Sequence, residues 1–265
     1  MRAASRLALS VAVLAALVLS ACGDDDDQTS TTASPGSSVS GEVVVFAASS
    51  LTAAFTEIGE AFSAANPDAT VTFNFAASSE LVTQIGEGAP ADVFASADES
   101  NMTKLTDAGN NGSEPAVFAT NLLEIIVGPD NPEGITGVED LANDDLIVVT
   151  CDVAVPCGKY AAQVFERAGV SVTPKSYEEN VKAVVTKVTL GEADAGIVYR
   201  TDVAAAGDDA TGVQIPGDIN VTAIYPIATT KEAGNPDGAA VFIAFVLSAD
   251  GQAILAGYGF GPPSA

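Results

Sequence analysis

One stretch near the start of the chain sets out its architecture: VVVFAASSLT, residues 43–52. Its first five residues form a short apolar run, which is typical of a strand buried on both faces of a sheet. Apolar residues then recur at helical spacing, at Leu51, Phe55, Ile58 and Phe62. The stretch therefore predicts a strand that passes through two serines into a helix, and Asn66-Pro67 ends that helix.

The same succession of strand and helix recurs along the chain. Residues 70–75 alternate like a strand and lead through Ser78 and Ser79 into a second helical segment, and residues 91–95 form another buried strand. Further strands are expected at 122–127, 146–150, 195–199 and 221–229, and further helices at 157–168, within 177–190, and at 238–256. This alternation predicts an α/β protein with mainly parallel sheets and helices on their faces.

These elements are enough for two α/β lobes, each built on its own mainly parallel sheet. We expect the chain to cross between the lobes twice, near residues 119–123 and 224–228, which would form a two-segment hinge. Residues 42–119 and 226–265 would then make up the first lobe, and residues 120–225 the second. Ligands of such sheets bind at the carboxyl ends of the strands, so the cleft between the lobes is the expected site.

The N-terminal residues are predicted to direct export. Arg2 and Arg6 precede an apolar run at 7–19, and small residues lead to Cys22, which makes an export signal too short for a membrane-spanning helix. A signal that ends at a cysteine resembles those of bacterial lipoproteins. We therefore expect residues 1–21 to be removed and Cys22 to carry lipid, anchoring the protein at the outer face of the cytoplasmic membrane or in the periplasm. An ordinary signal peptide that happens to contain a cysteine is the alternative.

Residues 22–41 are predicted to be a flexible tether. Four consecutive aspartates at 24–27 and the Ser/Thr-rich segment after them combine like charge with low hydrophobicity. The aspartates could instead hold a metal, but a charge run beside an anchor more often serves as a spacer.

Composition excludes several functions. The 265 residues carry a net charge of −25 and include no His, so nonspecific nucleic-acid binding is not expected. Without His, neither a Ser-His nor a Cys-His nucleophile can be built. The chain also has neither the glycine-rich P-loop nor the dinucleotide-binding glycine motif. We therefore expect neither an enzyme nor a cofactor-binding protein.

Cys151 and Cys157 are the cysteines that remain after Cys22. An exported protein meets an oxidising environment, and the intervening loop contains Pro156, so we hypothesise a disulfide between the two cysteines. Their spacing matches no zinc or redox motif, and no His is present to complete a metal site.

Small or hydroxyl residues stand between a strand and a helix three times: at 49–50, at 78–79, and before the helix at Cys157. A helix N-terminus presents unpaired N–H groups and a partial positive charge. Several such ends that converge on one cleft would bind an anion without any Lys or Arg. The alternative is that each serine only caps its own helix, which stabilises the helix by about 1 kcal/mol.

Seven segments then occur in order: FAASSLT at 46–52, FAASSEL at 75–81, GAPADVFASAD at 88–98, VPCGKY at 155–160, ENVK at 179–182, GIVYRTD at 196–202 and YGF at 258–260. Together they resemble the molybdate-binding proteins of molybdate ABC importers, over about residues 42–260. The resemblance implies a type II periplasmic-binding fold of two lobes. It also implies a monomer that delivers molybdate or tungstate to a membrane permease.

The resemblance implies five residues that contact the oxyanion: Ser50, Ser78, Cys157, Val181 and Tyr199. The two serines would each donate a hydroxyl and a backbone N–H. Cys157 and Val181 would each donate a backbone N–H, and Tyr199 would donate its phenolic O–H. No cofactor is implied, and no metal apart from the oxyanion itself. Without the resemblance, Val181 would be interpreted as a core valine and Tyr199 as a tyrosine at the end of a strand.

The sequence departs from the family pattern around Val181, where Asn180 and Lys182 replace Asp and Arg. This departure, and a disulfide through Cys157, would affect the geometry of the second lobe. Other interpretations also remain open: a binding protein for another tetrahedral oxyanion such as sulfate, a metal-ion-binding lipoprotein, an exported enzyme, and a surface adhesion module.

Overall fold

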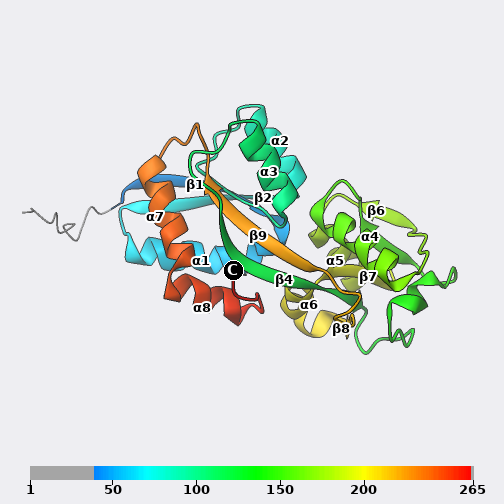
Figure 1. Ribbon diagram of the computed structural model, residues 1–265. Coiled ribbons are helices and arrows are strands. Elements are labelled where there is room, and N and C mark those ends of the chain that lie inside the picture. The colour runs from blue at the N-terminus through cyan, green and yellow to red at the C-terminus, as the bar shows by residue number, and fades with distance from the viewer. Residues whose placement is uncertain (1–38, 264–265) are drawn as a thin grey trace, which may run out of the picture. The chain divides into compact units, whose positions relative to one another are not determined.

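The computed structural model describes residues 39–263. The predicted signal peptide, Cys22 and the tether up to residue 38 lie outside the described residues. Within residues 39–263, nine strands form one continuous sheet in the order β2-β1-β3-β9-β4-β7-β5-β6, and β8 pairs with β4 (Figure 1). The strands are β1 (Gly41–Ala48), β2 (Ala69–Ala76), β3 (Val93–Ala95), β4 (Ala116–Val127), β5 (Val148–Cys151), β6 (Ser176–Glu178), β7 (Ala195–Tyr199), β8 (Thr211–Gln214) and β9 (Thr222–Thr229).

Helices flank this sheet, in agreement with the predicted α/β class. They are α1 (Thr52–Ala65), α2 (Ser78–Gly86), α3 (Glu99–Asp107), α4 (Pro156–Ala168), α5 (Val181–Thr189), α6 (Arg200–Ala206), α7 (Pro236–Leu247) and α8 (Ala249–Gly257). Short 3₁₀ helices occupy Ser49–Leu51, Val138–Ala142 and Gly207–Asp209. The sequence pattern does not predict α3, α6, β6 or β8, because each is too short to show a clear apolar periodicity.

The sheet has two halves with parallel pairing, and the strands that connect them pair antiparallel. In the first half β1 pairs in parallel with β2 and β3, and in the second half β5 pairs in parallel with β6 and β7. Strands β4 and β9 pair antiparallel with each other and with their neighbours β7 and β3. The parallel prediction therefore holds within each half, while β4 and β9 run in opposite directions because they carry the chain out of the first half and back.

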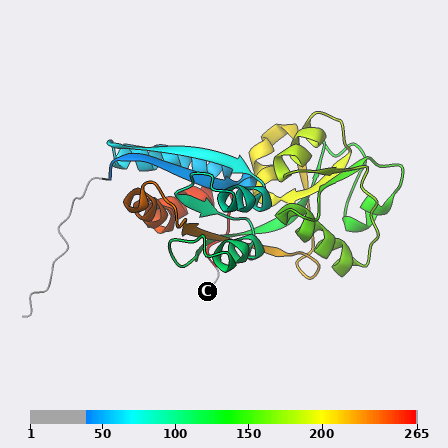
Figure 2. The same cartoon turned by 90° about the horizontal axis from the view of Figure 1, so that it is seen from above.

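Strand β4 belongs to both halves. It pairs with β9 from Ala116 to Leu122, and from Leu123 onward it pairs with β7. Figure 2 shows β4 and β9 running between the two groups of helices and strands. The sheets expected for the separate lobes are thus one continuous sheet, since a single long strand takes part in both.

Aromatic side chains fill the core of the first half. Phe242 of α7 is fully buried and lies 5.4 Å from Phe62 and 6.2 Å from Phe55, both of α1, between ring centroids. Alternate residues of β1 point to opposite faces, so Val45 joins this core while Phe46 joins a smaller cluster under α2 and α3. Helices therefore cover both faces of the first half of the sheet.

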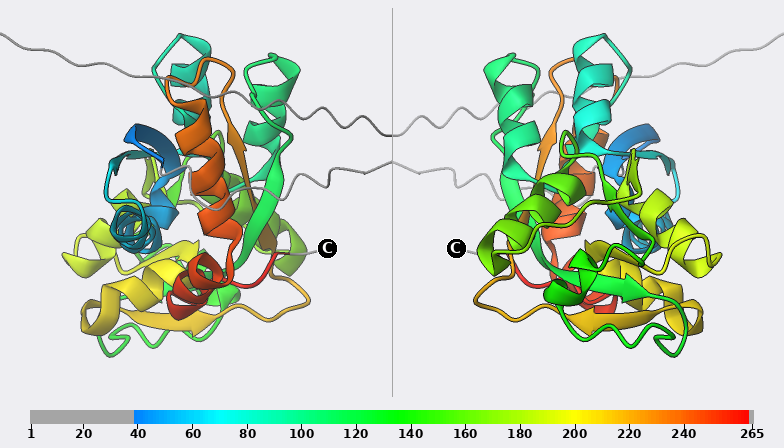
Figure 3. Two further views of the ribbon diagram at one scale, coloured as in Figure 1. Left: turned by 90° about the vertical axis from the view of Figure 1, so that its left-hand side faces the viewer. Right: turned by 90° about the vertical axis from the view of Figure 1, so that its right-hand side faces the viewer.

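The expected C-terminal helix at 238–256 is wrong in one respect, because the structure divides it into α7 and α8 at an angle of 61° (Figure 3). Ser248 starts the second helix, since its hydroxyl accepts the N–H of Gly251 at 3.3 Å. A side chain at Gly251 would place its Cβ 2.2 Å from the carbonyl oxygen of Phe245, so the close turn requires glycine. Among the described residues, no single helix is long and apolar enough to cross a membrane.

We predict that Phe242→Ala lowers the free energy of unfolding by about 3–5 kcal/mol, because it leaves a cavity among the aromatic rings of the core. Val241→Ala on the same helix is the matched control, since Val241 is 38% exposed and its truncation removes less buried surface than that of the fully buried Phe242. Urea denaturation of both variants measures the difference, and an equal loss in the two would show that α7 does not anchor this core.

Candidate functional site

Six strands end at one place between the two halves of the sheet. Residues that follow β1, β2 and β3 in the first half lie around the same cavity as residues that follow β5 and β6 and the last residue of β7 in the second half. Because the strands of each half are parallel, their carboxyl ends form a common edge, and the two edges share this cavity. The topology alone therefore brings together residues that are far apart in the sequence.

The cavity, called here the donor pocket, is lined by Ala48, Ser49, Ser50, Ala76, Ala77, Ser78, Ala97, Pro156, Cys157, Asn180, Val181 and Tyr199. All five residues predicted to contact the oxyanion are among them. The pocket offers about 10 Å³ to the centre of a water-sized sphere, which is about the space that one water molecule needs. A cavity of this size suits a compact ligand and has no room for a sugar or a peptide. None of its lining residues carries a charge.

The serines of the first half are not helix caps. The cap positions are Ala48 before the Ser49–Leu51 helix and Ala77 before α2, and no side chain caps either helix. Ser78 instead accepts the backbone N–H of Ala97 at 3.0 Å, and Ser50 Oγ lies 3.0 Å from the hydroxyl of Tyr225. The capping interpretation is therefore wrong for these residues. Since the Ser78 oxygen already accepts a bond, its own O–H is free to donate into the pocket.

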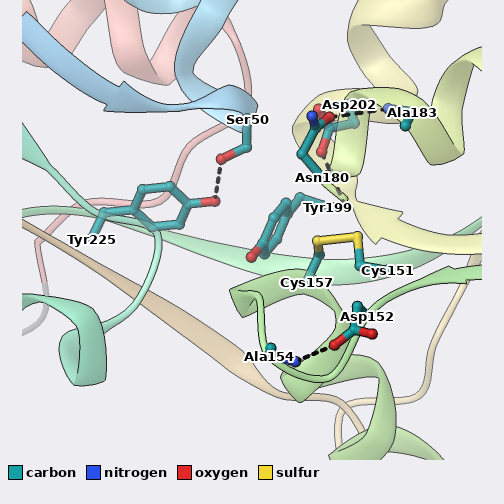
Figure 4. Close-up of a disulfide and its surroundings, with 10 residues drawn as sticks. All are labelled: Ser50, Cys151, Asp152, Ala154, Cys157, Asn180, Ala183, Tyr199, Asp202 and Tyr225. Carbon is teal, nitrogen blue, oxygen red and sulfur yellow. Dashed lines mark hydrogen bonds between the residues drawn. A yellow bond between two sulfur atoms is a disulfide. The ribbon is translucent and has the colours of Figure 1, made fainter. Parts of the chain in front are cut away.

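Helix α4 brings a backbone donor from the second half. Pro156 is its first residue and has no N–H, so the N–H of Cys157 is the first that the helix can present. A disulfide joins Cys151, the last residue of β5, to Cys157 in the first turn of α4 (Figure 4). A Cβ at Gly158 would lie 2.0 Å from the carbonyl oxygen of Asp152, so the turn packs directly on the preceding loop. The disulfide and this close packing hold the Cys157 N–H at the pocket.

Helix α5 brings a second backbone donor. Asn180 precedes it and accepts the N–H of Ala183 at 3.1 Å, and the helix then begins at Val181, which is 2% exposed. An amide oxygen serves this cap as well as a carboxylate does, so Asn at position 180 preserves the helix start. Lys182 forms an ion pair of 2.8 Å with Asp202, whose side chain is fully buried. Although Asn180 and Lys182 differ from the family pattern, α5 still has a capping residue, and Lys182 is paired with Asp202.

Tyr199 carries the most unusual group in the pocket. The residue is 1% exposed, and its hydroxyl is the one buried side-chain polar atom in the described residues that has no hydrogen-bond partner. Its ring lies 6.0 Å from that of Tyr225 (Figure 4) and 6.5 Å from that of Tyr160 (centroid distances), which fixes its position. A buried hydroxyl without a partner costs about 1–3 kcal/mol, so its retention calls for a ligand.

Burial controls the ionisation of the tyrosines and of Asp202. Burial raises the pKa of the Tyr199 hydroxyl well above its usual value, and nearby Tyr225, Tyr160, Asp202 and Asp98 raise it further. Burial likewise raises the pKa of Asp202, against the opposing effect of Lys182. Because an unperturbed tyrosine ionises only near pH ~10, the Tyr199 O–H stays a donor throughout the neutral range.

Sequence reasoning missed two residues that shape the site. Tyr225 supports Ser50 and is itself fully buried, but it lies inside the apolar run of β9, where its ring suggests only core packing. Ala97 orients Ser78 through its backbone N–H, and no side-chain signal marks a backbone donor. As to the metal-binding alternative, no group of three or more His, Cys, Asp or Glu in residues 39–263 is placed to hold a metal ion.

Comparison with known proteins gives matches over nearly the whole chain. The sequence profile of the bacterial extracellular solute-binding protein family matches residues 43–261. The molybdate-binding protein ModA of Mycobacterium tuberculosis H37Rv is 40% identical over 262 residues, covering 97% of this chain and 99% of the relative.

Solved structures of other binding proteins have a similar fold. The substrate binding domain of a putative molybdenum ABC transporter from Clostridium difficile is 29% identical, with a TM-score of 0.64 over 84% of this chain and 99% of that one. The sulfate-binding protein SubI from Mycobacterium tuberculosis superposes with a TM-score of 0.76 over 83% of this chain and 86% of that one, at 18% identity, and so shares the fold alone.

The unpaired hydroxyl gives a test that needs no ligand. We predict that Tyr199→Phe raises the free energy of unfolding by about 1 kcal/mol or more, because it removes a buried polar group without a partner. Tyr225→Phe is the matched control, and it should lower stability by about 1 kcal/mol because it breaks the bond to Ser50. Chemical denaturation without oxyanion would reveal these opposite signs, and a loss of stability in Tyr199→Phe would mean that its hydroxyl is satisfied.

Proposed function

The chain belongs to the bacterial extracellular solute-binding protein family, and we propose that it captures molybdate or tungstate outside the cytoplasm and delivers the oxyanion to an ABC importer. The observation that carries the proposal is the buried hydroxyl of Tyr199, which has no partner in a pocket made of neutral hydrogen-bond donors. The 40% identical relative named as a molybdate-binding protein supports this choice of ligand. Molybdate acts here as a transported ligand, not as a cofactor.

The donors favour a fully ionised tetrahedral dianion. Ser50, Ser78 and Tyr199 offer hydroxyls, while Cys157 and Val181 offer N–H groups at helix starts. A protonated phosphate would bring a hydroxyl hydrogen that meets donors and finds no acceptor, which disfavours it. The partial positive charges of the helix N-termini add to the attraction.

The strongly acidic composition does not oppose an anionic ligand. The chain carries −25 overall, but charges at the exposed surface are screened beyond about 8 Å at physiological salt. Hydrogen bonds act within about 3 Å, in a pocket where no lining residue is charged. The nearby donors therefore determine which ligand binds.

We also propose that the two halves of the sheet act as lobes that close on the anion. The hinge would lie at residues 119–123 and 224–228, close to where β4 changes its partner from β9 to β7. The anion would first contact Ser50 and Ser78 on the first lobe, and closure would add Cys157, Val181 and Tyr199 from the second. Closure excludes water and so strengthens each hydrogen bond.

The protein is also proposed to act outside the cytoplasm as a lipid-anchored monomer. The family is one of extracellular proteins, which agrees with an exported chain. We propose that residues 1–21 are a signal peptide, that Cys22 carries the lipid anchor and that residues 22–38 are a tether. The tether predicted to reach residue 41 is too long at its end, because Val39 is buried in the core and β1 begins at Gly41. We further propose a monomer without catalytic activity, whose closed form docks on a membrane permease.

The ligand is tested by titration calorimetry of the purified full chain with molybdate, tungstate, sulfate and phosphate. We expect tight binding of molybdate and tungstate, and weak binding of sulfate and phosphate. Tight binding of sulfate alone would keep the mechanism and change the substrate to that of the fold relative. If none of the four anions gives a heat of binding, the proposed function is wrong.

Ser78 can be tested separately by substitution. We predict that Ser78→Ala weakens oxyanion binding by about 1–3 kcal/mol, because a hydrogen bond to a charged ligand is lost. Ser79→Ala is the matched control, since Ser79 is the next residue of the same helix and does not line the pocket. Calorimetry of both variants measures the difference, and unchanged affinity in Ser78→Ala would exclude this hydroxyl from the site.

A further inference from the structure

One charged contact joins the two halves of the sheet beside the donor pocket. Lys159 of α4 extends from the second half to the start of α3 in the first half. Its ammonium nitrogen Nζ lies 3.4 Å from Asp98 Oδ2 and 2.9 Å from Ser100 Oγ. Asp98 and Lys159 both lie in segments that carry the family resemblance, yet neither lines the donor pocket. The binding chemistry described above therefore leaves both residues without a role.

We propose that Lys159 is an interlobe latch, a cation whose contact with Asp98 and Ser100 forms on closure and slows release of the bound oxyanion. The proposal rests on the proposed function, since it assigns the lifetime of the closed complex to a residue that does not touch the ligand. Lys159 is thus a positioning residue for the capture step.

The first-half side of the latch is held by bonds within the first half. Asp98 is the N-cap of α3 and accepts the backbone N–H of Asn101 at 3.0 Å and its side-chain amide at 2.8 Å. Ser100 donates to Asp98 Oδ2 at 2.5 Å, and the Asp98 side chain is 1% exposed. These bonds all lie within the first half, so they do not depend on the presence of Lys159. Loss of its cation then leaves a buried negative charge, which opposes opening.

Lys159 is the one Lys or Arg within ion-pair distance of Asp98 in the described part of the chain. Another contact between the halves, from Arg200 to the carbonyl oxygen of Gly259 at 2.8 Å, is exposed and ends on a neutral acceptor. The contact made by Lys159 differs because its acceptor is both charged and buried. It is therefore the contact whose loss has the larger effect on closure.

The latch is continuous with the anion contacts on both sides. In the first half, Ala97 precedes Asp98 and donates its N–H to Ser78. In the second half, Lys159 lies two residues after Cys157, in the first turn of α4. Closure of the ion pair therefore brings the Cys157 N–H and the Ser78 hydroxyl to the same pocket.

The charge of Lys159 has a second consequence for an anionic ligand. Asp98 lies near enough to the pocket to help raise the pKa of Tyr199, so its negative charge would also repel a bound dianion. Lys159 offsets that charge at close range. Removing the cation would therefore weaken the closed complex in two ways. The ion pair between the two halves would be lost, and the negative charge of Asp98 would repel the bound dianion without compensation.

Lys159→Gln tests the latch, with Lys187→Gln as the matched control. Lys187 contacts a serine hydroxyl at 3.0 Å and a carboxylate at 2.6 Å, as Lys159 does, but both partners, Ser176 and Glu178, lie within the second half. The two lysines are similarly exposed, at 43% and 32% of the side chain. Each substitution removes one positive charge, and Lys187 differs from Lys159 chiefly in that its ion pair does not connect the two halves.

Two measurements on the full chain distinguish the latch from the proposed function. The first is the rate of molybdate release, followed by competition with tungstate in stopped flow. We expect Lys159→Gln to release about three- to tenfold faster, from the loss of a partly exposed ion pair and a charge-assisted hydrogen bond. Lys187→Gln should match the unaltered protein, and Lys159→Arg should recover most of the loss.

The second measurement needs no ligand. Spin labels at exposed Thr103 of α3 and Glu166 of α4 report the share of molecules whose two halves are closed without ligand, and Lys159→Gln should lower that share in favour of longer distances. If the unaltered protein binds no oxyanion, the proposed function fails while this distance still decides the latch. Ser100→Ala, which removes one partner of Lys159 from the first half, should act in the same direction if Lys159→Gln folds poorly. Unchanged release and unchanged distances in these variants would overturn the proposal.

Discussion

A buried hydroxyl with no partner is the constraint around which this protein is organised. Tyr199 is held among other aromatic rings at the end of β7, and its O–H has nothing within the described chain to bond. In folded proteins buried polar groups are normally hydrogen-bonded, because an unpaired buried donor costs free energy. The neighbouring hydroxyls and the N–H groups at the helix starts are also able to donate, and no lining residue carries a negative charge. A tetrahedral oxyanion supplies acceptor oxygens for these donors on every side.

The fold provides this arrangement through its topology. Two sets of parallel strands end at facing edges, and the long strands β4 and β9 connect them in one sheet. Each parallel strand passes into a helix or a loop at its carboxyl end. Several helix starts that are far apart in the sequence therefore meet at one pocket. The disulfide between Cys151 and Cys157 and the cap at Asn180 then hold two of these starts in place.

Charge is separated by distance in this molecule. The acidic residues that give the chain its net charge of −25 do not line the donor pocket, and the two buried carboxylates beside it are each paired with a lysine. Lys182 neutralises Asp202 within the second half, whereas Lys159 neutralises Asp98 across the two halves. The same chemical pairing thus stabilises a single helix start in one place and joins the two sides of the binding site in the other.

The sequence by itself determined the α/β class, the strand-to-helix units and, through ordered motifs, the five residues that the structure brings to one pocket. Periodicity and motifs are local properties, so residues such as Ser50 and Val181 can be recognised from their own neighbours. Only the tertiary structure decided that Ser78 bonds to Ala97 and is no cap, that Tyr225 supports Ser50, and that the C-terminal segment breaks at Ser248. It also decided that Lys159 meets Asp98, which lies 61 positions earlier in the chain. These contacts depend on which strands become neighbours, and no short-range pattern encodes that choice.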